Sequence, residues 1–140
     1  MARSRRTRSV APRRLILDSG AVIALCRDDP RARAVLRAAW EAGVEVSIPA
    51  VVLAETVRGA AADAPVNRVA RAVGSVDEID AASGRTAGAL LGRTGSSATV
   101  DAIVVGVAIE RGGAVILTGD PDDLRLLAGD HPEVIVQALG

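Results

Sequence analysis

The stretch Leu15-Ile16-Leu17-Asp18-Ser19-Gly20-Ala21-Val22-Ile23-Ala24-Leu25 decides the fold. An apolar run rich in branched side chains is followed by a short polar step and a second apolar run. This pattern predicts a buried strand that leads into a helix. Asp18 is the only ionisable side chain in the stretch, and it stands where the strand ends. Capping of the following helix is the ordinary role of an Asp at such a position, and a functional carboxylate is the alternative.

The same alternation of strand and helix continues along the chain. Short apolar runs predict strands at 14–17, 44–48, 75–79, 114–117 and 133–136. Helical spacing predicts helices over 32–40, from Pro49 onward, and over 64–73, 80–91, 97–111 and 121–129. Strands separated by helices imply an α/β fold, with a five-stranded, mainly parallel sheet covered by helices on both faces. A chain of 140 residues accommodates one such domain.

The composition excludes several classes of site. All 17 basic residues are Arg, so Schiff-base chemistry and the phosphate-binding Lys of nucleotide-binding loops are absent. Cys26 and His131 are single, which excludes a disulfide framework or a Cys-rich zinc site and favours a reducing, cytoplasmic compartment. No apolar run is long enough for a membrane helix. Trp40 is the only aromatic residue and is expected to pack in an aliphatic core beside Leu36.

Charge is divided unevenly along the chain. Residues 1–14 contain six Arg and no acid, whereas residues 15–140 contain 11 Arg and 17 acids. We therefore expect a flexible basic extension over 1–14 and a folded acidic domain over 15–140. Two roles remain open for this extension. It contacts an anionic partner such as nucleic acid, or it is only a solvated leader.

Two further acids stand alone in apolar helices. Glu55 is the only acid in the segment 49–59, where an unpaired buried carboxylate would be costly and must meet a cation, a donor or a metal. Arg58, one turn later, is its candidate structural partner. Asp101 is surrounded by Val, Ile and Ala, which predicts a buried helix. Since Ser96 or Ser97 is available as the cap, Asp101 is a functional candidate, with interaction with the helix dipole as the alternative.

A fourth acidic position follows the strand predicted at 114–117. Asp120 leaves its carboxyl end after Thr118 and Gly119, and Asp122 and Asp123 stand beside it. Acids also favour the first turn of a helix, which is the structural alternative. Ligands of open α/β sheets bind at the carboxyl ends of strands, where the strand order reverses.

If the strands that precede Asp18 and Asp120 are neighbours, an all-oxygen site would form from four carboxylates, those of Asp18, Glu55, Asp101 and Asp120. Such a site suits Mg²⁺ or Mn²⁺ and disfavours zinc.

The order of these segments resembles a known family. Asp18-Ser19-Gly20-Ala21, Ala54-Glu55-Thr56-Val57-Arg58-Gly59, Asp101-Ala102-Ile103 and Thr118-Gly119-Asp120-Pro121-Asp122-Asp123 look like the four acidic motifs of PIN-domain nucleases. The glutamate motif is most similar to that of the VapC toxin of bacterial VapBC toxin-antitoxin modules. The resemblance implies a strand order of 3-2-1-4-5 and a metal-dependent endoribonuclease that leaves a 5′-phosphate and a 3′-hydroxyl.

The resemblance also assigns roles and partners. Asp18, Glu55, Asp101 and Asp120 would be the catalytic and metal-binding residues, with Asp123 as an additional ligand, and Mg²⁺ or Mn²⁺ as the cofactor. Ser19, Arg58 and Thr118 are candidates for contacting substrate or supporting the ligands. The implied partners are an RNA substrate, a cognate antitoxin and a second copy in a homodimer, with no membrane.

Two alternatives remain open at the level of sequence. One is a non-catalytic PIN relative that binds RNA or a protein partner. The other is a different Mg²⁺-dependent phosphoryl-transfer enzyme, such as a phosphatase or a receiver domain, although no Lys is present to support it.

Overall fold

A computed structural model describes residues 14–140 of the chain. The expected flexible extension falls on residues outside the described part, apart from Arg14, which is the first residue of strand β2 (Arg14–Leu17). The other strands are β3 (Glu45–Pro49), β4 (Val76–Asp77), β5 (Ala114–Thr118) and β6 (Val134–Ala138). The helices are α1 (Ser19–Cys26), α2 (Pro30–Glu41), α3 (Ala50–Thr56), α4 (Ala64–Val73), α5 (Ala81–Thr94), α6 (Thr99–Glu110) and α7 (Asp122–Ala128), with a 3₁₀ turn at Ala61–Asp63.

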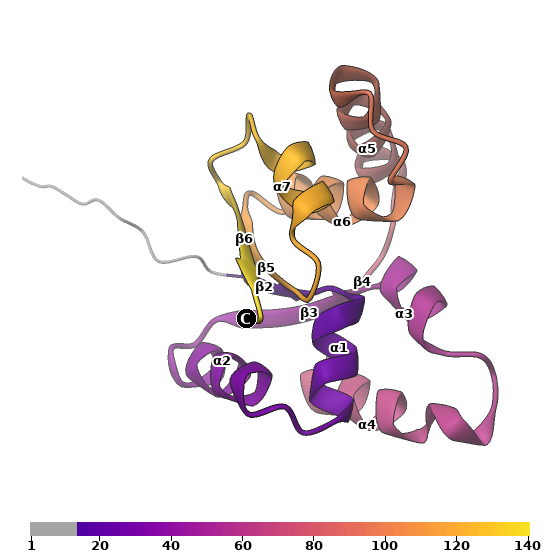
Figure 1. Ribbon diagram of the computed structural model, residues 1–140, viewed down its shortest axis with the longest axis vertical. Coiled ribbons are helices and arrows are strands. Elements are labelled where there is room, and N and C mark those ends of the chain that lie inside the picture. The colour runs from indigo at the N-terminus through magenta and orange to yellow at the C-terminus, as the bar shows by residue number, and fades with distance from the viewer. Residues whose placement is uncertain (1–13) are drawn as a thin grey trace, which may run out of the picture.

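The described strands form one parallel sheet in the order β4-β3-β2-β5-β6. In chain order this is 3-2-1-4-5, so the predicted fold class and strand order are confirmed. Figure 1 shows α1, α2 and α4 on one face of the sheet and α5, α6 and α7 on the other. None of the helices between residues 14 and 140 has the length and apolar character needed to cross a membrane.

The core consists of aliphatic side chains, as the composition predicts. Ile16 and Leu17 of β2, Ile116 and Leu117 of β5 and the inner residues of α6 are almost completely buried. The chain continues along one side of β2 to β3 and later returns on the other side to β5, so the strand order reverses at β2. The carboxyl ends of β2 and β5 are adjacent, with Leu17 paired to Leu117.

Several local predictions are wrong, each for a tertiary reason. Pro49 ends β3 in extended backbone, opposite Asp77, because a φ near −61° suits a strand end as well as a helix start. Helix α6 has Ala98 at its N-cap instead of Ser96 or Ser97. Trp40 is 47% exposed on α2, where Ala32 and Leu36 face the core instead.

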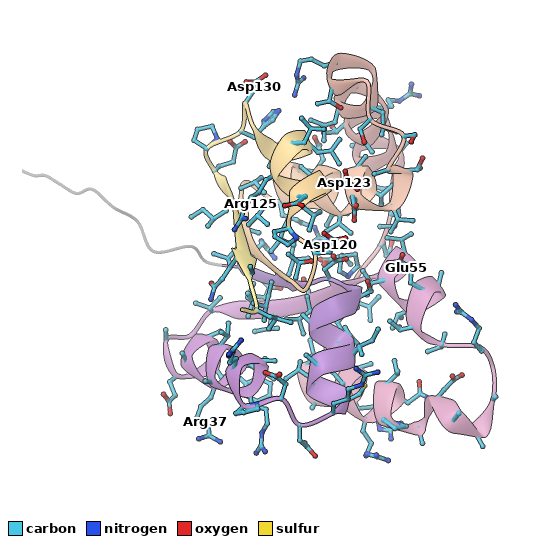
Figure 2. All side chains as sticks on the ribbon, in the orientation of Figure 1. Arg37, Glu55, Asp120, Asp123, Arg125 and Asp130 are labelled. Carbon is cyan, nitrogen blue, oxygen red and sulfur yellow. The ribbon has the colours of Figure 1, made fainter. Side chains whose placement is uncertain are left out.

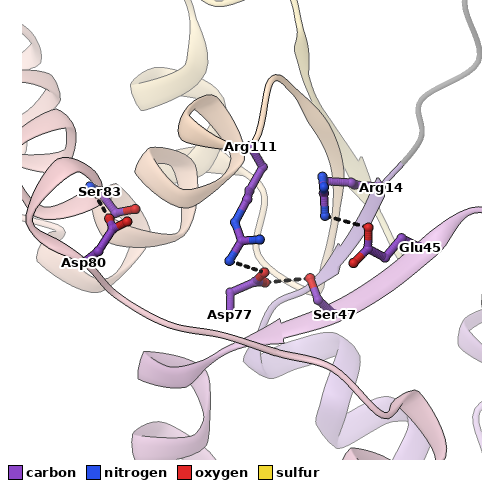
Figure 3. A network of polar contacts seen from close by, with 7 residues as sticks. All are labelled: Arg14, Glu45, Ser47, Asp77, Asp80, Ser83 and Arg111. Atoms are coloured by element: carbon purple, nitrogen blue, oxygen red, sulfur yellow. Dashed lines mark hydrogen bonds and ion pairs between the residues drawn. The ribbon is translucent and has the colours of Figure 1, made fainter.

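A buried polar network fixes the edge of the sheet (Figure 3). Ser47 of β3 donates a hydrogen bond to Asp77 of β4, and Arg111 at the end of α6 forms an ion pair with the same carboxylate at 3.3 Å. Asp77 is 2% exposed, yet both of its oxygens have partners. This network connects the two-residue strand β4 to β3 and to α6, so a buried Asp in this fold has a purely structural use when its partners are complete.

Candidate functional site

Asp18 is buried where β2 turns into α1. It occupies the N-cap position with extended backbone, but its side chain forms no capping hydrogen bond to the helix. The ordinary role of an Asp at this position, capping of the following helix, is therefore wrong for Asp18. Instead, Oδ2 of Asp18 accepts a hydrogen bond of 2.9 Å from Oγ1 of Thr118 at the end of β5.

Thr118 connects two of the acidic segments. Its side chain is completely buried, and its Oγ1 also accepts a hydrogen bond of 3.0 Å from the backbone N–H of Asp120. Thr118 therefore holds the Asp18 carboxylate and shapes the turn that carries Asp120. The hydroxyl was a candidate for contact with substrate, and in the structure it is engaged with these two residues.

A close contact between two glycines brings the same two turns together. A Cβ atom at Gly20 would lie 2.7 Å from the backbone nitrogen of Gly119 and 3.1 Å from its Cα. No residue other than glycine therefore fits at position 20 without displacement of the backbone that follows β5. Asp18 and Thr118 directly follow the paired residues Leu17 and Leu117, and the glycine contact lets the two turns beyond them approach closely.

One oxygen of Asp18 has no partner. Asp18 is 5% exposed, and its Oδ1 is the one buried side-chain polar atom among residues 14–140 that forms no hydrogen bond. The other buried aspartates differ, because Asp77 has two side-chain partners and Asp63 accepts from three backbone N–H groups. Leaving a buried carboxylate oxygen unsatisfied costs free energy, so this atom points to a ligand that is recruited from outside the chain.

Asp101 lies in the first turn of α6 and is half-buried. Loss of hydration on burial raises the pKa of its carboxyl to about 6, and repulsion from Asp18, Asp123, Glu55 and Asp120 adds to the effect. Four of the carboxylates singled out by the sequence therefore act on the fifth, Asp101, at this end of the sheet. A bound cation would relieve that repulsion.

Glu55 lies near the end of α3, and its environment differs from the prediction. The side chain is exposed, so the expectation of a buried carboxylate in an apolar setting is wrong. Partial loss of hydration and repulsion from Asp18 raise its pKa, and a hydrogen bond with the Ser19 side chain opposes this. Glu55 and Ser19 thus border Asp18 from the side of α3 and α1.

Arg58 does not pair with Glu55. Its Nη1 donates to the backbone carbonyls of Ala54, at 3.0 Å, and Val57, at 2.7 Å, and so satisfies carbonyl groups at the end of α3. The last carbonyl groups of a helix have no N–H donor within the helix, and the guanidinium group of Arg58 supplies donors to them. Arg58 is a structural residue in this arrangement, and the predicted pair is wrong.

Asp63 is a buried residue that sequence reasoning missed. Its carboxylate accepts hydrogen bonds from the backbone N–H groups of Arg58, Gly59 and Ala60, at 2.7 to 3.0 Å, and fixes the turn after α3. These hydrogen bonds hold its pKa below the usual value of 3.8. The only signal in the sequence is an acid placed a few residues after a glycine, a pattern that is too common to be specific.

Replacement of Asp63 by Asn is expected to lower the melting temperature at pH 7, because an amide has one acceptor oxygen and is a weaker acceptor. A carboxyl whose folded pKa is depressed stabilises the fold above its unfolded pKa and loses this effect as the pH falls through the folded value. The difference between wild type and variant should therefore shrink below pH 3.8.

Thermal unfolding between pH 2 and pH 7 measures this difference. Glu78→Gln is a matched control, because Glu78 is exposed and has no hydrogen bond or ion pair within residues 14–140. An Asp63→Asn variant with the same pH profile as wild type would show that the turn does not depend on the charge.

The fourth acidic segment lies on the turn between β5 and α7. Asp120 and Asp123 are exposed and face the region between α7 and α3, toward Glu55 (Figure 2). Asp122 is also exposed but does not contribute to the pKa of Asp101. The site is thus an open acidic rim with Asp18 at its base. Within the described part of the chain, however, no three carboxylates are gathered closely enough to hold a metal ion.

Comparisons with known proteins agree with the fold. The family model of the PIN domain matches residues 15–129. No curated protein sequence matches the chain.

Solved structures with the same architecture include toxin-antitoxin complexes. VapBC2 from Rickettsia felis, bound to a DNA fragment from its promoter, is 15% identical with a TM-score of 0.70, over 89% of this chain and 98% of that chain. DNA-bound VapBC from Salmonella typhimurium is 17% identical with a TM-score of 0.67, over 91% and 98% of the two chains. A toxin-antitoxin complex from Klebsiella pneumoniae is 19% identical with a TM-score of 0.66, over 86% and 95%. At these identities the similarity establishes a common fold.

Proposed function

The chain belongs to the PIN domain family, and from this premise we propose that it is a divalent-metal-dependent endoribonuclease and the toxin of a toxin-antitoxin pair. The observation that carries the proposal is the unpartnered Oδ1 of Asp18, buried at the base of a rim formed by four other carboxylates. Where a buried Asp has only a structural role, as at Asp77, both of its oxygens have partners within the protein. Asp18 keeps one oxygen free.

The donor set fits a hard cation. Asp18, Glu55, Asp101 and Asp120 would hold Mg²⁺ or Mn²⁺, with Asp123 as an additional ligand, because all their donor atoms are oxygens. When bound, the ion supplies a water molecule of lowered pKa and neutralises charge on the phosphodiester. Repulsion from the other four carboxylates contributes to the raised pKa of Asp101, and a bound cation would relieve it.

The chain's own residues define what can reach this site. Thr118 holds one oxygen of Asp18 at the base of the rim by a hydrogen bond, while Glu55 and Asp123 at its borders are exposed. The open rim admits a polymer such as RNA. Ser19 is placed to orient Glu55, whereas the hydrogen bonds of Arg58 to backbone carbonyls favour a structural role over contact with substrate.

Cleavage of RNA in the presence and absence of divalent ions tests the proposal. We expect the purified protein to cleave a mixed RNA pool with Mg²⁺ or Mn²⁺, to leave 5′-phosphate ends, and to be inactive with EDTA. Asp130→Asn, an exposed carboxylate on the turn before β6, is the control and should retain activity. Full cleavage in EDTA would contradict the metal requirement. Metal binding by calorimetry without any cleavage would favour the non-catalytic RNA-binding relative.

The partners follow from the same proposal. The solved structures are toxin-antitoxin complexes, and the acidic rim of this chain is complementary to an Arg side chain of an antitoxin, which would form charge-assisted hydrogen bonds with the carboxylates. We propose a cognate antitoxin as the inhibitor and a homodimer as the toxin assembly. Co-expression with the product of a neighbouring short reading frame, followed by purification and sizing, tests both.

A further inference from the structure

Two arginines stand at the border of the acidic rim on the side of β6. The rim lies at the carboxyl ends of β2 and β5, and β6 ends beside it, because the backbone N–H of Leu139 donates to the carbonyl of Thr118 at 2.9 Å. Arg31 of α2 and Arg125 of α7 are exposed at this end of β6. We propose that both arginines bind RNA phosphates adjacent to the phosphodiester that is cleaved, and so position the strand across the rim. This inference rests on the proposed function.

Arg31 is held at the carboxyl edge of the sheet. Its Nη1 donates a hydrogen bond of 3.5 Å to the carbonyl of Leu139. A Cβ atom at Gly140 would collide with the same nitrogen, so the glycine leaves the space that the guanidinium group occupies. The end of β6 lies two strands from the end of β2, which is about 10 Å. A phosphate bound by Arg31 is therefore close to, but not the same as, the phosphodiester that lies over Asp18.

Most donors of Arg31 are free for a ligand. A guanidinium group has several N–H donors, and the hydrogen bond to Leu139 engages one of them. Among residues 14–140, no carboxylate forms an ion pair with Arg31, neither that of Asp28 nor the terminal one of Gly140. Asp29 accepts instead from backbone N–H groups at the start of α2. One hydrogen bond thus orients a group whose other donors can form a bidentate contact with phosphate, and orientation before binding lowers its entropic cost.

Arg125 approaches the same place from the other face of the sheet. Helix α7 packs against β6, and Leu124 and Leu127 turn its inner side toward the core. Asp123 and Arg125 are two residues apart, about 200° around the helix, so they project from opposite flanks. The charge of Asp123 acts on Asp101 of α6, which leaves Arg125 on the flank toward β6, where Figure 2 shows it. The fold therefore places one arginine on each face of the sheet at the end of β6.

Position, and not exposure alone, distinguishes these two arginines. Figure 2 shows Arg37, another exposed arginine of α2, pointing away from the body of the protein. Arg71 is exposed in the last turn of α4, which leads to the amino end of β4. The domain as a whole is acidic, since residues 15–140 contain 17 acids and 11 arginines. Two cationic groups beside the rim therefore give a polyanion one side from which it can approach the site.

Steady-state cleavage of RNA in Mg²⁺ tests the proposal. Arg31→Ala/Arg125→Ala should raise KM about tenfold, because two charge-assisted contacts with phosphate are lost. It should change kcat by less than about threefold, since neither group contacts the reacting atoms. Arg37→Ala/Arg71→Ala removes the same charge from surfaces away from the rim and should keep both constants. Melting temperatures of all variants measure whether the fold is retained.

RNA binding at increasing NaCl and fixed Mg²⁺, in an Asp101→Asn background, reports the phosphate contacts. The salt slope of the Arg31→Ala/Arg125→Ala protein should be smaller by up to about 1.4, since each lost contact on a single strand removes about 0.7. Arg31→Lys/Arg125→Lys keeps both charges without the bidentate geometry, so it should retain the slope while KM stays partly raised. A purely structural role at the end of β6 would change the melting temperature and leave the slope intact.

Three results would overturn the proposal. A salt slope equal to that of the parent protein, or an equal effect of the two Ala double variants, means that RNA does not contact these arginines specifically. A normal KM for RNA combined with weaker inhibition by a co-expressed antitoxin would assign the arginines to a protein partner. Normal cleavage by the Arg31→Ala/Arg125→Ala protein contradicts the positioning role alone, whereas a reduced slope in a protein whose parent never cleaves RNA contradicts the nuclease proposal alone.

Discussion

Replacement of Asp101 by Asn is expected to reduce RNA cleavage by more than about 100-fold, which corresponds to the loss of roughly 3 kcal/mol of transition-state stabilisation. The side chain lies in the first turn of a buried helix, where the charges of the other four carboxylates of the rim act on it. An amide of the same shape keeps the geometry but removes a charge that a divalent ion requires.

The same substitution should stabilise the metal-free protein. Burial and repulsion raise the pKa of Asp101 from 3.8 to about 6 in the folded state, so wild type loses stability as the pH rises through this window. The Asn variant lacks this loss. Above pH 6 we expect it to be more stable by about 1 kcal/mol, allowing for solvent screening at a half-exposed group, and the difference should disappear as the pH falls toward 3.8.

Melting curves in EDTA between pH 3.5 and pH 8, together with initial cleavage rates in Mg²⁺, measure both effects on one protein sample. Asp122→Asn is the control, since Asp122 is a neighbouring exposed acid that does not act on Asp101. It should change neither property by a comparable amount. An Asp101→Asn protein that cleaves like wild type would remove the basis of the nuclease assignment.

Replacement of Gly20 by Ala is expected to reduce cleavage by about 100-fold, because displacement of reacting groups by about 1 Å has effects of this size. The added methyl group would meet backbone atoms of Gly119 at 2.7 and 3.1 Å, and backbone cannot rotate away as a side chain can. The turn after β5 must then move, and the hydrogen bond between Thr118 and Asp18 is lost or distorted. Overpacking of this kind costs about 1–3 kcal/mol of stability.

Gly88→Ala is a closely matched control. Gly88 lies in α5, and a Cβ atom there would meet nothing within 4 Å. The same chemical change should stabilise that helix by about 0.5–1 kcal/mol and leave activity intact. Melting temperature and kcat for both variants test the contrast. A Gly20→Ala enzyme with normal kcat would show that the glycine contact does not position the site.

Much of the fold was readable in the sequence because strands of a parallel sheet are apolar on both faces. The runs at 14–17 and 114–117 predict β2 and β5 closely, and the buried helix around Asp101 was predicted from its uniform apolar character. Predictions failed where two local conformations suit a residue equally well. Pro49 is compatible with a strand end or a helix start, and only its pairing with Asp77 on the neighbouring strand selects the first.

The sequence by itself determined which acids stand alone at the carboxyl ends of strands or within apolar helices, since that depends on chemical type and periodicity. Tertiary structure decided their actual states. Asp18 is buried because β2 and β5 are neighbours, and its Oδ1 is left without a partner because Thr118 donates only to Oδ2. Arg58 turned to backbone carbonyls because α3 ends there, and Glu55 remained exposed. The exposure of Trp40 was also decided only in three dimensions, since the direction of a helix against its sheet fixes which residues face solvent. Contacts between residues 100 positions apart, such as Thr118 with Asp18, leave no local pattern to read.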